Sequence, residues 1–414
     1  MTETGRFTLA NGLRVVHRRN SDTAMVALTV TSATGSRHED PSLTGVAHLF
    51  EHVMFGGSLN VPDYNGAISA AGGEDNAYTS SDFTTYYSVV PAHNAETAFR
   101  AESDRMLRPL LSPQVVDVQR SGVTEEFRQQ CLNSPYGDTM HHLLPMIYPD
   151  GHPYSWPTIG KDISHIARIT RDDLEQWFLR NYSVHNAVLG ITGNITAERA
   201  RDLAEKWFGD IAPRPVAGHT LPRQVTKPLC TLKKVSGNVP VTRITVAYPM
   251  APYGHPDTVA ADALTDLLSD GNASLLPNRL VRVPDAVFTQ TDAMITAREL
   301  QGNLLLTAQL SDERHDPEAA ARLLTDTAAT IALNDLTDRQ LQRIKNRRAA
   351  ICALNDMDYI GTAQRLCLAE IHGEQPDDAL DAYMALTADR INDVARRILL
   401  ETTPAVMIYH PANS

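Results

Sequence analysis

Two histidines and one glutamate near the start of the chain have the types and the spacing that metal-dependent hydrolysis requires. His48 and His52 are four residues apart, so on an α-helix they lie one above the other and can bind one metal ion. Glu51 shares this face of the helix, where its carboxylate can orient and deprotonate a metal-bound water. The pattern H-x-x-E-H therefore predicts a hydrolytic metal site.

The residues around this motif predict the short helix that presents it. Ser42 or Thr44 could cap the start of the helix, and Gly56 and Gly57 follow its end. Apolar packing positions lie between them, at Val46, Leu49, Phe50 and Val53. A histidine pair alone also occurs on helices that bind no metal, and the glutamate between the two makes a metal site the better interpretation.

A third protein ligand is expected further along the chain. Zinc at a catalytic site has three protein ligands and keeps a fourth position open for water. A predicted helix over residues 113–132 carries two adjacent acids, Glu125 and Glu126, which lie about 100° apart around the helix axis. Only one of the two can face the metal. The alternative is that both belong to a solvated helix face, and spacing alone does not choose.

Composition restricts the class of protein. A chain of 414 residues is too long for one core and predicts two or three domains of about 100–200 residues. Hydrophobic residues make up 43% and charged residues 21%, as in ordinary globular proteins. The net charge of −12 argues against a nucleic-acid partner, and no run of 18 apolar residues predicts a membrane span. Scattered cysteines and an N-terminus without a signal-peptide pattern predict a cytoplasmic location.

A proline-rich segment nearly bisects the chain. Residues 212–228 contain four prolines and have no hydrophobic periodicity, so they predict a linker between domains at 1–211 and 229–414. The first domain is expected to open with a hairpin at Asn11-Gly12, and a second hairpin is expected over residues 76–90.

The second half of the chain repeats the first weakly. A shift of 216 residues places Val30 on Val246 and the metal-motif helix on a helical segment at residues 257–268. Under this shift the three motif residues fall on Leu264, Leu267 and Leu268. The pattern predicts a duplicated domain that kept its fold and lost its metal, and hence one metal ion per chain.

The motif is accompanied by further short segments of a recognisable kind. They are Leu9–Arg14, Gly35–Arg37, Thr44–Ala47, Phe55–Gly57, Asn76–Thr79, His152–Tyr154 with Ile159-Gly160, and Asp270–Ser274. Together they resemble the pitrilysin-like zinc metallopeptidases, the group that includes the mitochondrial processing peptidase and insulin-degrading enzyme. The similarity spans most of the chain and is densest in the first 160 residues.

This resemblance implies an α+β fold of two homologous domains, each a mainly antiparallel sheet packed with helices on one side. It implies a zinc-dependent endopeptidase with one zinc ion per chain and a peptide substrate enclosed in a chamber of four such domains. This chain supplies two of them. A homologous partner subunit is therefore expected to complete the chamber in a heterodimer, with a homodimer as the alternative.

The resemblance also implies roles for single residues. Family members have their third zinc ligand after an apolar residue and often another acid, a pattern that selects Glu126. A family acid seven residues earlier supports the site, and Gln119 stands there as an uncharged replacement. The substrate peptide is expected to add as an extra strand along four residues, Asn76, Ala77, Tyr78 and Thr79.

One part of the family pattern is incomplete in the second half. Self-sufficient members have an arginine and a tyrosine there, and the tyrosine hydroxyl helps to polarise the scissile carbonyl. Arg282 fits the arginine of this pair as a substrate-binding residue, but Phe288 stands at the tyrosine position. The missing hydroxyl favours the heterodimer, in which the homologous partner subunit is expected to supply the arginine and the tyrosine. This departure also leaves open a second reading, a catalytically inactive metal-binding scaffold subunit. The intact Glu51 between two ligands argues against it.

Overall fold

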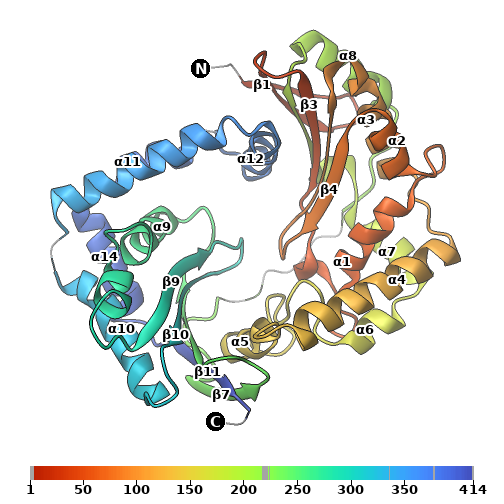
Figure 1. Cartoon of the computed structure of the whole chain (residues 1–414). Helices are drawn as coiled ribbons and strands as arrows, with labels where there is room; N and C mark the ends of the chain where they lie inside the picture. Colours follow the sequence, from red (N-terminus) through yellow and green to blue (C-terminus); the bar gives the residue numbers. More distant parts are fainter. Residues whose placement is uncertain (1–3, 217–221, 223, 335, 376–377, 413–414) are drawn as a thin grey trace. The chain divides into compact units, whose positions relative to one another are not determined.

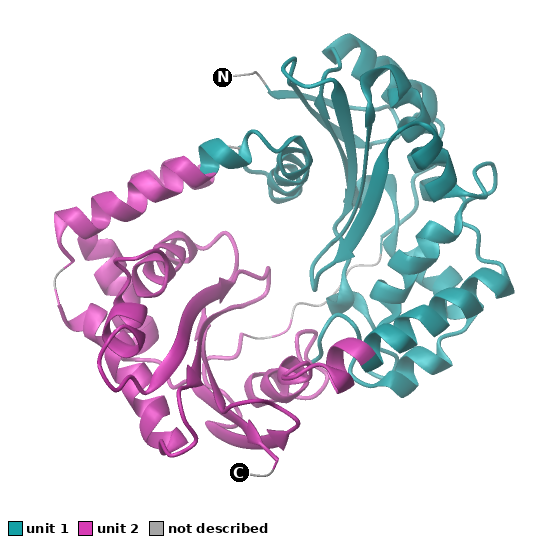
Figure 2. Ribbon diagram, in the orientation of Figure 1, with its two compact units in different colours: residues 1–128, 156–220, 352–376 teal, residues 129–155, 221–351, 377–414 magenta. Residues whose placement is uncertain are grey.

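The protein is described here by a computed structural model that covers residues 4–216, 222, 224–334, 336–375 and 378–412 (Figure 1). These residues form two compact units, coloured separately in Figure 2. Unit 1 comprises residues 1–128, 156–220 and 352–376, and unit 2 comprises residues 129–155, 221–351 and 377–414. Each unit contains one β-sheet with helices packed against it. The expected α+β class with two domains is confirmed.

The sheet of unit 1 has six strands in the order β1-β2-β6-β3-β5-β4. Their bounds are β1 Thr4–Thr8, β2 Arg14–Arg19, β6 Ala187–Gly193, β3 Met25–Ser32, β5 Thr84–Pro91 and β4 Glu74–Thr79. All neighbours are antiparallel except β2 and β6. The expected Asn11-Gly12 turn joins β1 to β2, and Gly12 has the positive φ of 91° that such a turn needs. Strand β4 lies at the edge of the sheet.

Helices cover both faces of this sheet. On one face, α2 (Tyr64–Ala70), α3 (Ala95–Leu107) and α8 (Ala197–Phe208) enclose a core that includes Leu189 and Ile191 of β6. Side chains alternate along a strand, so Gly190 faces the opposite side, where α12 (Tyr359–His372) packs with Cys367. The family resemblance implies helices on one side of the sheet, and the structure has a helix on the second side as well. Residues 352–375 pack with unit 1, although they follow the expected domain boundary at 229.

The sheet of unit 2 repeats this topology in the order β7-β11-β8-β10-β9, and its described residues include no counterpart of β1. Its strands are β7 Leu232–Gly237, β11 Ala405–Pro411, β8 Arg243–Met250, β10 Gly302–Leu310 and β9 Phe288–Thr296. One face packs on α9 (Pro256–Leu268), α10 (Pro317–Leu333) and α14 (Ala388–Leu399). The other face packs on α5 (Thr139–Ile147), which precedes the expected linker in the sequence. Each sheet is thus covered on its second face by a helix from the other half of the chain.

The duplication places α9 where unit 1 has α1 (Val46–Val53), since each helix follows the central strand of its sheet. The positions that correspond to the motif, Leu264, Leu267 and Leu268, are at most 2% exposed in the core of unit 2. Leucine side chains therefore fill this core where unit 1 has ionisable ones. The expected linker at 212–228 lies partly outside the described residues, and its described part contains no helix or strand.

The remaining helices are α4 (Pro113–Phe127), α6 (Ile163–Arg168), α7 (Arg171–Asn181), α11 (Asp338–Asn355) and α13 (Asp378–Met384). Helix α4 begins with Ser112 as its N-cap and Pro113 in its first turn, and it continues into a π-helical turn at residues 128–133. In the described part of the chain, no helix combines the length and the apolar character that a membrane span requires.

Candidate metal centre

Helix α1 carries the H-x-x-E-H motif, and its apolar side fixes it within unit 1. Phe50 is fully buried and stacks on Phe178 of α7 with 5.8 Å between ring centroids. The start of the helix differs from the prediction, because neither Ser42 nor Thr44 is its N-cap. Gly45 holds this position with a φ of 91°, a conformation that glycine adopts without strain. The hydroxyl of Thr44 instead accepts a hydrogen bond from the Lys161 N–H at 2.7 Å.

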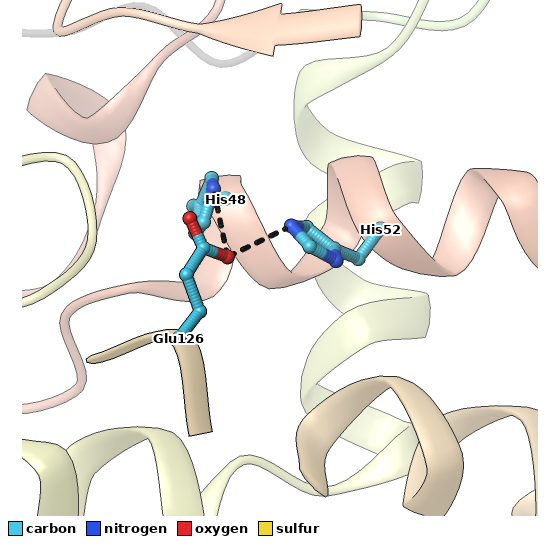
Figure 3. Close-up of side chains that lie close together, drawn as sticks. All are labelled: His48, His52 and Glu126. Atoms are coloured by element: carbon cyan, nitrogen blue, oxygen red, sulfur yellow. Dashed lines mark ion pairs between the residues drawn. The ribbon is translucent and has the colours of Figure 1, made fainter. Parts of the chain in front are cut away.

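Three side chains from α1 and α4 converge (Figure 3). Nε2 of His52 lies 3.4 Å from Oε2 of Glu126, and Nε2 of His48 lies 3.9 Å from the same oxygen. All three possible ligand atoms lie within 4.8 Å of one another. The neighbouring Glu125 is exposed and forms an ion pair with Arg128 at 3.3 Å instead. The packing of α4 on α1 therefore brings Glu126, and not Glu125, to the histidines.

These distances can be compared with what zinc requires. Zinc binds nitrogen and oxygen at about 2.0–2.1 Å in a tetrahedral arrangement, which separates ligand atoms by about 3.3–3.4 Å. The 3.4 Å between His52 and Glu126 matches this spacing, and the 3.9 Å to His48 is within a small side-chain rotation of it. Two imidazoles and one carboxylate are also the ligand types of catalytic zinc sites. The residues present fit a zinc ion with one open position.

The environment of the three side chains suits a metal with access to solvent. The side chain of His52 is 30% exposed and that of Glu126 is 27% exposed, so one side of the group is open. Burial and, to a smaller extent, the neighbouring His52 lower the pKa of His48 to about 4, against the charge of Glu126, which raises it. His48 is therefore neutral at pH 7, the form in which an imidazole can bind a metal.

Glu51 lies on the same helix and is held by a neighbouring strand. Its Oε2 accepts a hydrogen bond of 2.5 Å from the hydroxyl of Thr79, at the end of β4. Glu51 is only 6% exposed, and burial raises its pKa, while the bond from Thr79 opposes part of this rise. The carboxylate is thus fixed in one orientation next to the convergent group.

The strand expected to bind the peptide, Asn76 to Thr79, is part of the edge strand β4. Ser80 donates to the carbonyl of Phe83, and hydrogen-bonded pairs alternate along an antiparallel hairpin. This alternation turns the backbone groups of Ala77 and Thr79 away from β5. The Ala77 N–H confirms this direction, because it bonds to Oδ1 of Asn76 at 2.8 Å instead of to β5.

Three other residues predicted from the family resemblance lie in three different environments: half-buried on α4, exposed in unit 2 and buried in the core of unit 2. Gln119 lies on α4 two turns before Glu126 and is half-buried, and its side-chain amide has no hydrogen bond to another described residue. Arg282 is exposed in unit 2 and donates to the carbonyl of Asn272 at 2.8 Å. Phe288 is 1% exposed in the core of unit 2, so a tyrosine with this side-chain orientation would bury its hydroxyl among apolar groups. The comparison of Phe288 with a catalytic tyrosine therefore fails on packing.

Sequence reasoning missed a buried cation close to the motif. Arg105 of α3 is fully buried and forms an ion pair of 2.7 Å with Glu102. Its guanidinium lies 4.2 Å from the ring centroid of Tyr64 and 4.4 Å from that of Tyr86. Its charge is one of the influences that lower the pKa of Glu51. An acid and a base three residues apart on a helix normally indicate a solvated face, so no sequence pattern indicated this burial.

Comparison with known proteins identifies the family. Residues 14–160 match the family described as Insulinase (Peptidase family M16), and residues 168–348 match the Peptidase M16 inactive domain. The chain belongs to peptidase family M16. This confirms the pitrilysin-like resemblance, and the description "inactive domain" falls on the half in which leucines replace the motif residues.

Individual relatives and solved structures agree with this chain in length, in fold or in both. The uncharacterized zinc protease YmxG of Bacillus subtilis is 23% identical over 99% of this chain and 98% of its own length. A protease from Helicobacter pylori of known structure has a TM-score of 0.88 at 22% identity, over 99% of this chain and 100% of that one. The periplasmic protease PqqL of Escherichia coli has a TM-score of 0.79 at 19% identity, and this chain covers 48% of it.

Proposed function

We propose that this M16 protein is a zinc-dependent endopeptidase subunit. The observation that carries the proposal is the fixed position of Glu51, whose carboxylate is held by Thr79 beside the convergent His48, His52 and Glu126. The names of relatives such as the zinc protease YmxG support zinc and proteolysis as the class of activity. The three ligands and the base each come from helices α1 and α4 of unit 1, so one zinc per chain is proposed.

The roles of the side chains follow from their chemistry. His48, His52 and Glu126 would hold the zinc, which when bound acts as a Lewis acid and makes water acidic near neutral pH. Glu51 accepts the proton of the attacking water and then gives the same proton to the amine nitrogen that leaves when the peptide bond breaks. Thr79 keeps the Glu51 carboxylate in the orientation for both transfers. Gln119 is proposed only as a neutral support near Glu126.

The peptide is proposed to bind as an extra strand along β4. The outward N–H and C=O groups of Ala77 and Thr79 provide the hydrogen bonds, with Asn76 and Tyr78 beside them. The Ala77 N–H now donates to Oδ1 of Asn76, and in the complex a peptide carbonyl would replace this oxygen as the acceptor. Because Thr79 bonds to Glu51 through its side chain, the same residue links the strand to the base. Arg282 remains a proposed substrate contact on unit 2.

A partner subunit remains part of this proposal. Family resemblance implies four domains around the substrate, this chain supplies two, and PqqL has about twice its length. Since Phe288 lies in a core, its missing hydroxyl no longer supports a heterodimer over a homodimer. A homologous partner of similar length is proposed, with a second copy of this chain as the alternative.

The test compares wild type with Glu51→Gln. The amide keeps the size of the side chain but is no base, so the variant is expected to bind zinc as wild type does and to lose hydrolysis of unfolded peptides. Wild type must be assayed alone and with candidate partner subunits. Full zinc binding without hydrolysis under any of these conditions would favour the second function, a metal-binding scaffold that holds peptides. The hydrogen bond between Thr79 and Glu51 argues against a scaffold, which needs no positioned base.

A further inference from the structure

A buried carboxylate outside the motif contacts the first residues of the metal-motif helix. Glu39 is 6% exposed and lies just after the short 3₁₀ helix at Ser36–His38. Its Oε1 accepts the N–H of Ala47 at 2.8 Å, and its Oε2 accepts the N–H of Gly45 at 3.0 Å. Oε2 also accepts the indole N–H of Trp156 at 2.9 Å. Both oxygens are used, and all three of these partners are donors.

These contacts replace an ordinary helix cap. The first N–H groups of a helix have no acceptor within the helix, and here the N-cap is a glycine without a side chain. Glu39 supplies the missing acceptors from a distant part of the loop. In its ionised form, Glu39 also places a negative charge at the positive end of the α1 dipole. Burial raises the pKa of Glu39 to about 8 against these hydrogen bonds, which favour the ionised form.

The same segment is attached to the hairpin that contains β4. The Ser36 N–H donates to the carbonyl of Ser80 at 3.1 Å, and the Arg37 N–H donates to the carbonyl of Ser81 at 2.9 Å. Arg37 also forms an ion pair of 3.1 Å with Asp82. Residues 36–39 therefore bridge the β4–β5 turn and the start of α1. A shift of Glu39 would move the helix relative to the strand.

We propose that Glu39 is a positioning residue that sets the place of α1 against β4. It acts through the N–H groups of Gly45 and Ala47, and so it fixes where the His48 and Glu51 side chains lie relative to Thr79. This inference rests on the proposed function only for the name of the metal and of the reaction. The physical claim concerns the helix start and holds for the metal-free chain.

The first test needs no variant. Backbone amide exchange of Gly45 and Ala47 is measured by NMR in the zinc-free wild-type chain. Ala47 is in the first turn and has no acceptor within α1, and Glu39 is the acceptor that the structure gives its amide. Protection of both amides is expected. Exchange at the rate of an open chain would overturn the proposal, whether or not the protein cleaves peptides.

The second test uses Glu39→Gln, Trp156→Phe and the control Glu205→Gln, an exposed acid of α8. A glutamine has one acceptor oxygen and presents its NH2 group to a donor, so one helix N–H loses its partner. The Glu39→Gln variant is expected to weaken zinc binding about 10–100-fold, as loss of a residue that orients ligands does. The Trp156→Phe variant keeps both helix contacts, and its zinc affinity is expected to fall far less.

Two readouts separate positioning from general stability. Zinc affinity is measured by chelator competition, and the visible spectrum of the cobalt-loaded chain reports ligand geometry. A changed cobalt spectrum in folded Glu39→Gln, with an unchanged spectrum in Glu205→Gln, is expected. Wild-type zinc affinity and spectrum in folded Glu39→Gln would overturn the proposal. If Glu39→Gln does not fold, the proposal is decided by the amide exchange of wild type and the zinc affinity of Trp156→Phe. A fall in the zinc affinity of Trp156→Phe as large as that expected for Glu39→Gln would overturn the proposal.

Discussion

Replacement of Thr79 by valine isolates the hydrogen bond that holds the proposed base. Valine has nearly the shape of threonine and lacks the hydroxyl that donates to Oε2 of Glu51 at 2.5 Å. The strand itself should be little affected, because the backbone groups of Thr79 point away from β5 and the Ser80 N–H next to it bonds to the carbonyl of Phe83. The Thr84 hydroxyl, 3.5 Å from that of Thr79, keeps its hydrogen bond of 2.9 Å to the carbonyl of Thr34. The side chain of Thr79 is not one of the three convergent ligands, so zinc content should stay at the wild-type value.

The size of the effect follows from the burial of the bond. A hydrogen bond to a charged group contributes about 1.5–3 kcal/mol, and each 1.4 kcal/mol corresponds to about a tenfold change in rate. Because Glu51 is only 6% exposed, water has little access to replace the lost donor. We therefore expect kcat to fall about 10–100-fold in Thr79→Val. KM should change little, because the peptide contacts proposed for β4 are made by backbone groups.

The assay is steady-state hydrolysis of an internally quenched peptide by zinc-loaded protein, with the partner subunit present if wild type needs it. Thr79→Ser is the matched control, since it keeps the hydroxyl and should keep most of the wild-type kcat. A Thr79→Val variant that contains zinc and has a kcat within about twofold of wild type would refute the reasoning. So would a rise in KM that accounts for the whole loss in kcat/KM.

Three further predictions concern the metal and the fold. Metal analysis should find one zinc per wild-type chain and none in His52→Ala, whereas two per chain would contradict the loss of the second site. Glu126→Gln should weaken zinc binding and Glu125→Gln should not, and the reverse result would show that the wrong acid was assigned. In Gly190→Ala the added methyl would lie 2.6 Å from the sulfur of Cys367. The free energy of unfolding, measured with a denaturant, is therefore expected to fall by about 1–3 kcal/mol. Gly122→Ala, whose methyl meets no atom within 4 Å, is the control and should be neutral or stabilising.

Much of the fold could be predicted from local patterns. The Asn11-Gly12 turn, the hairpin that begins near Asn76 and the helix that begins at Pro113 all have signals within a few residues of themselves. The duplication was also predictable, because each half has an apolar strand segment followed by a helix whose apolar face has to be buried. The start of α1 was predicted wrongly, since Thr44 resembles a cap but bonds to Lys161, which is distant in the sequence.

The sequence by itself determined which residues could perform the chemistry. His48, Glu51 and His52 share a helix face by spacing alone, because their geometry depends only on the period of one helix. The choice of Glu126 over Glu125 needed the family resemblance, and the packing of α4 on α1 agrees with it.

Only the tertiary structure decided how these residues are held. Thr79 reaches Glu51, and Glu39 reaches the start of α1, because the chain folds back on itself across loops whose paths no local pattern encodes. The same holds for α12 and α5, each of which covers the sheet of the other half. Hydrophobic periodicity shows that a helix has an apolar face, but it does not say which sheet will bury that face, since any apolar surface gives a similar gain in free energy.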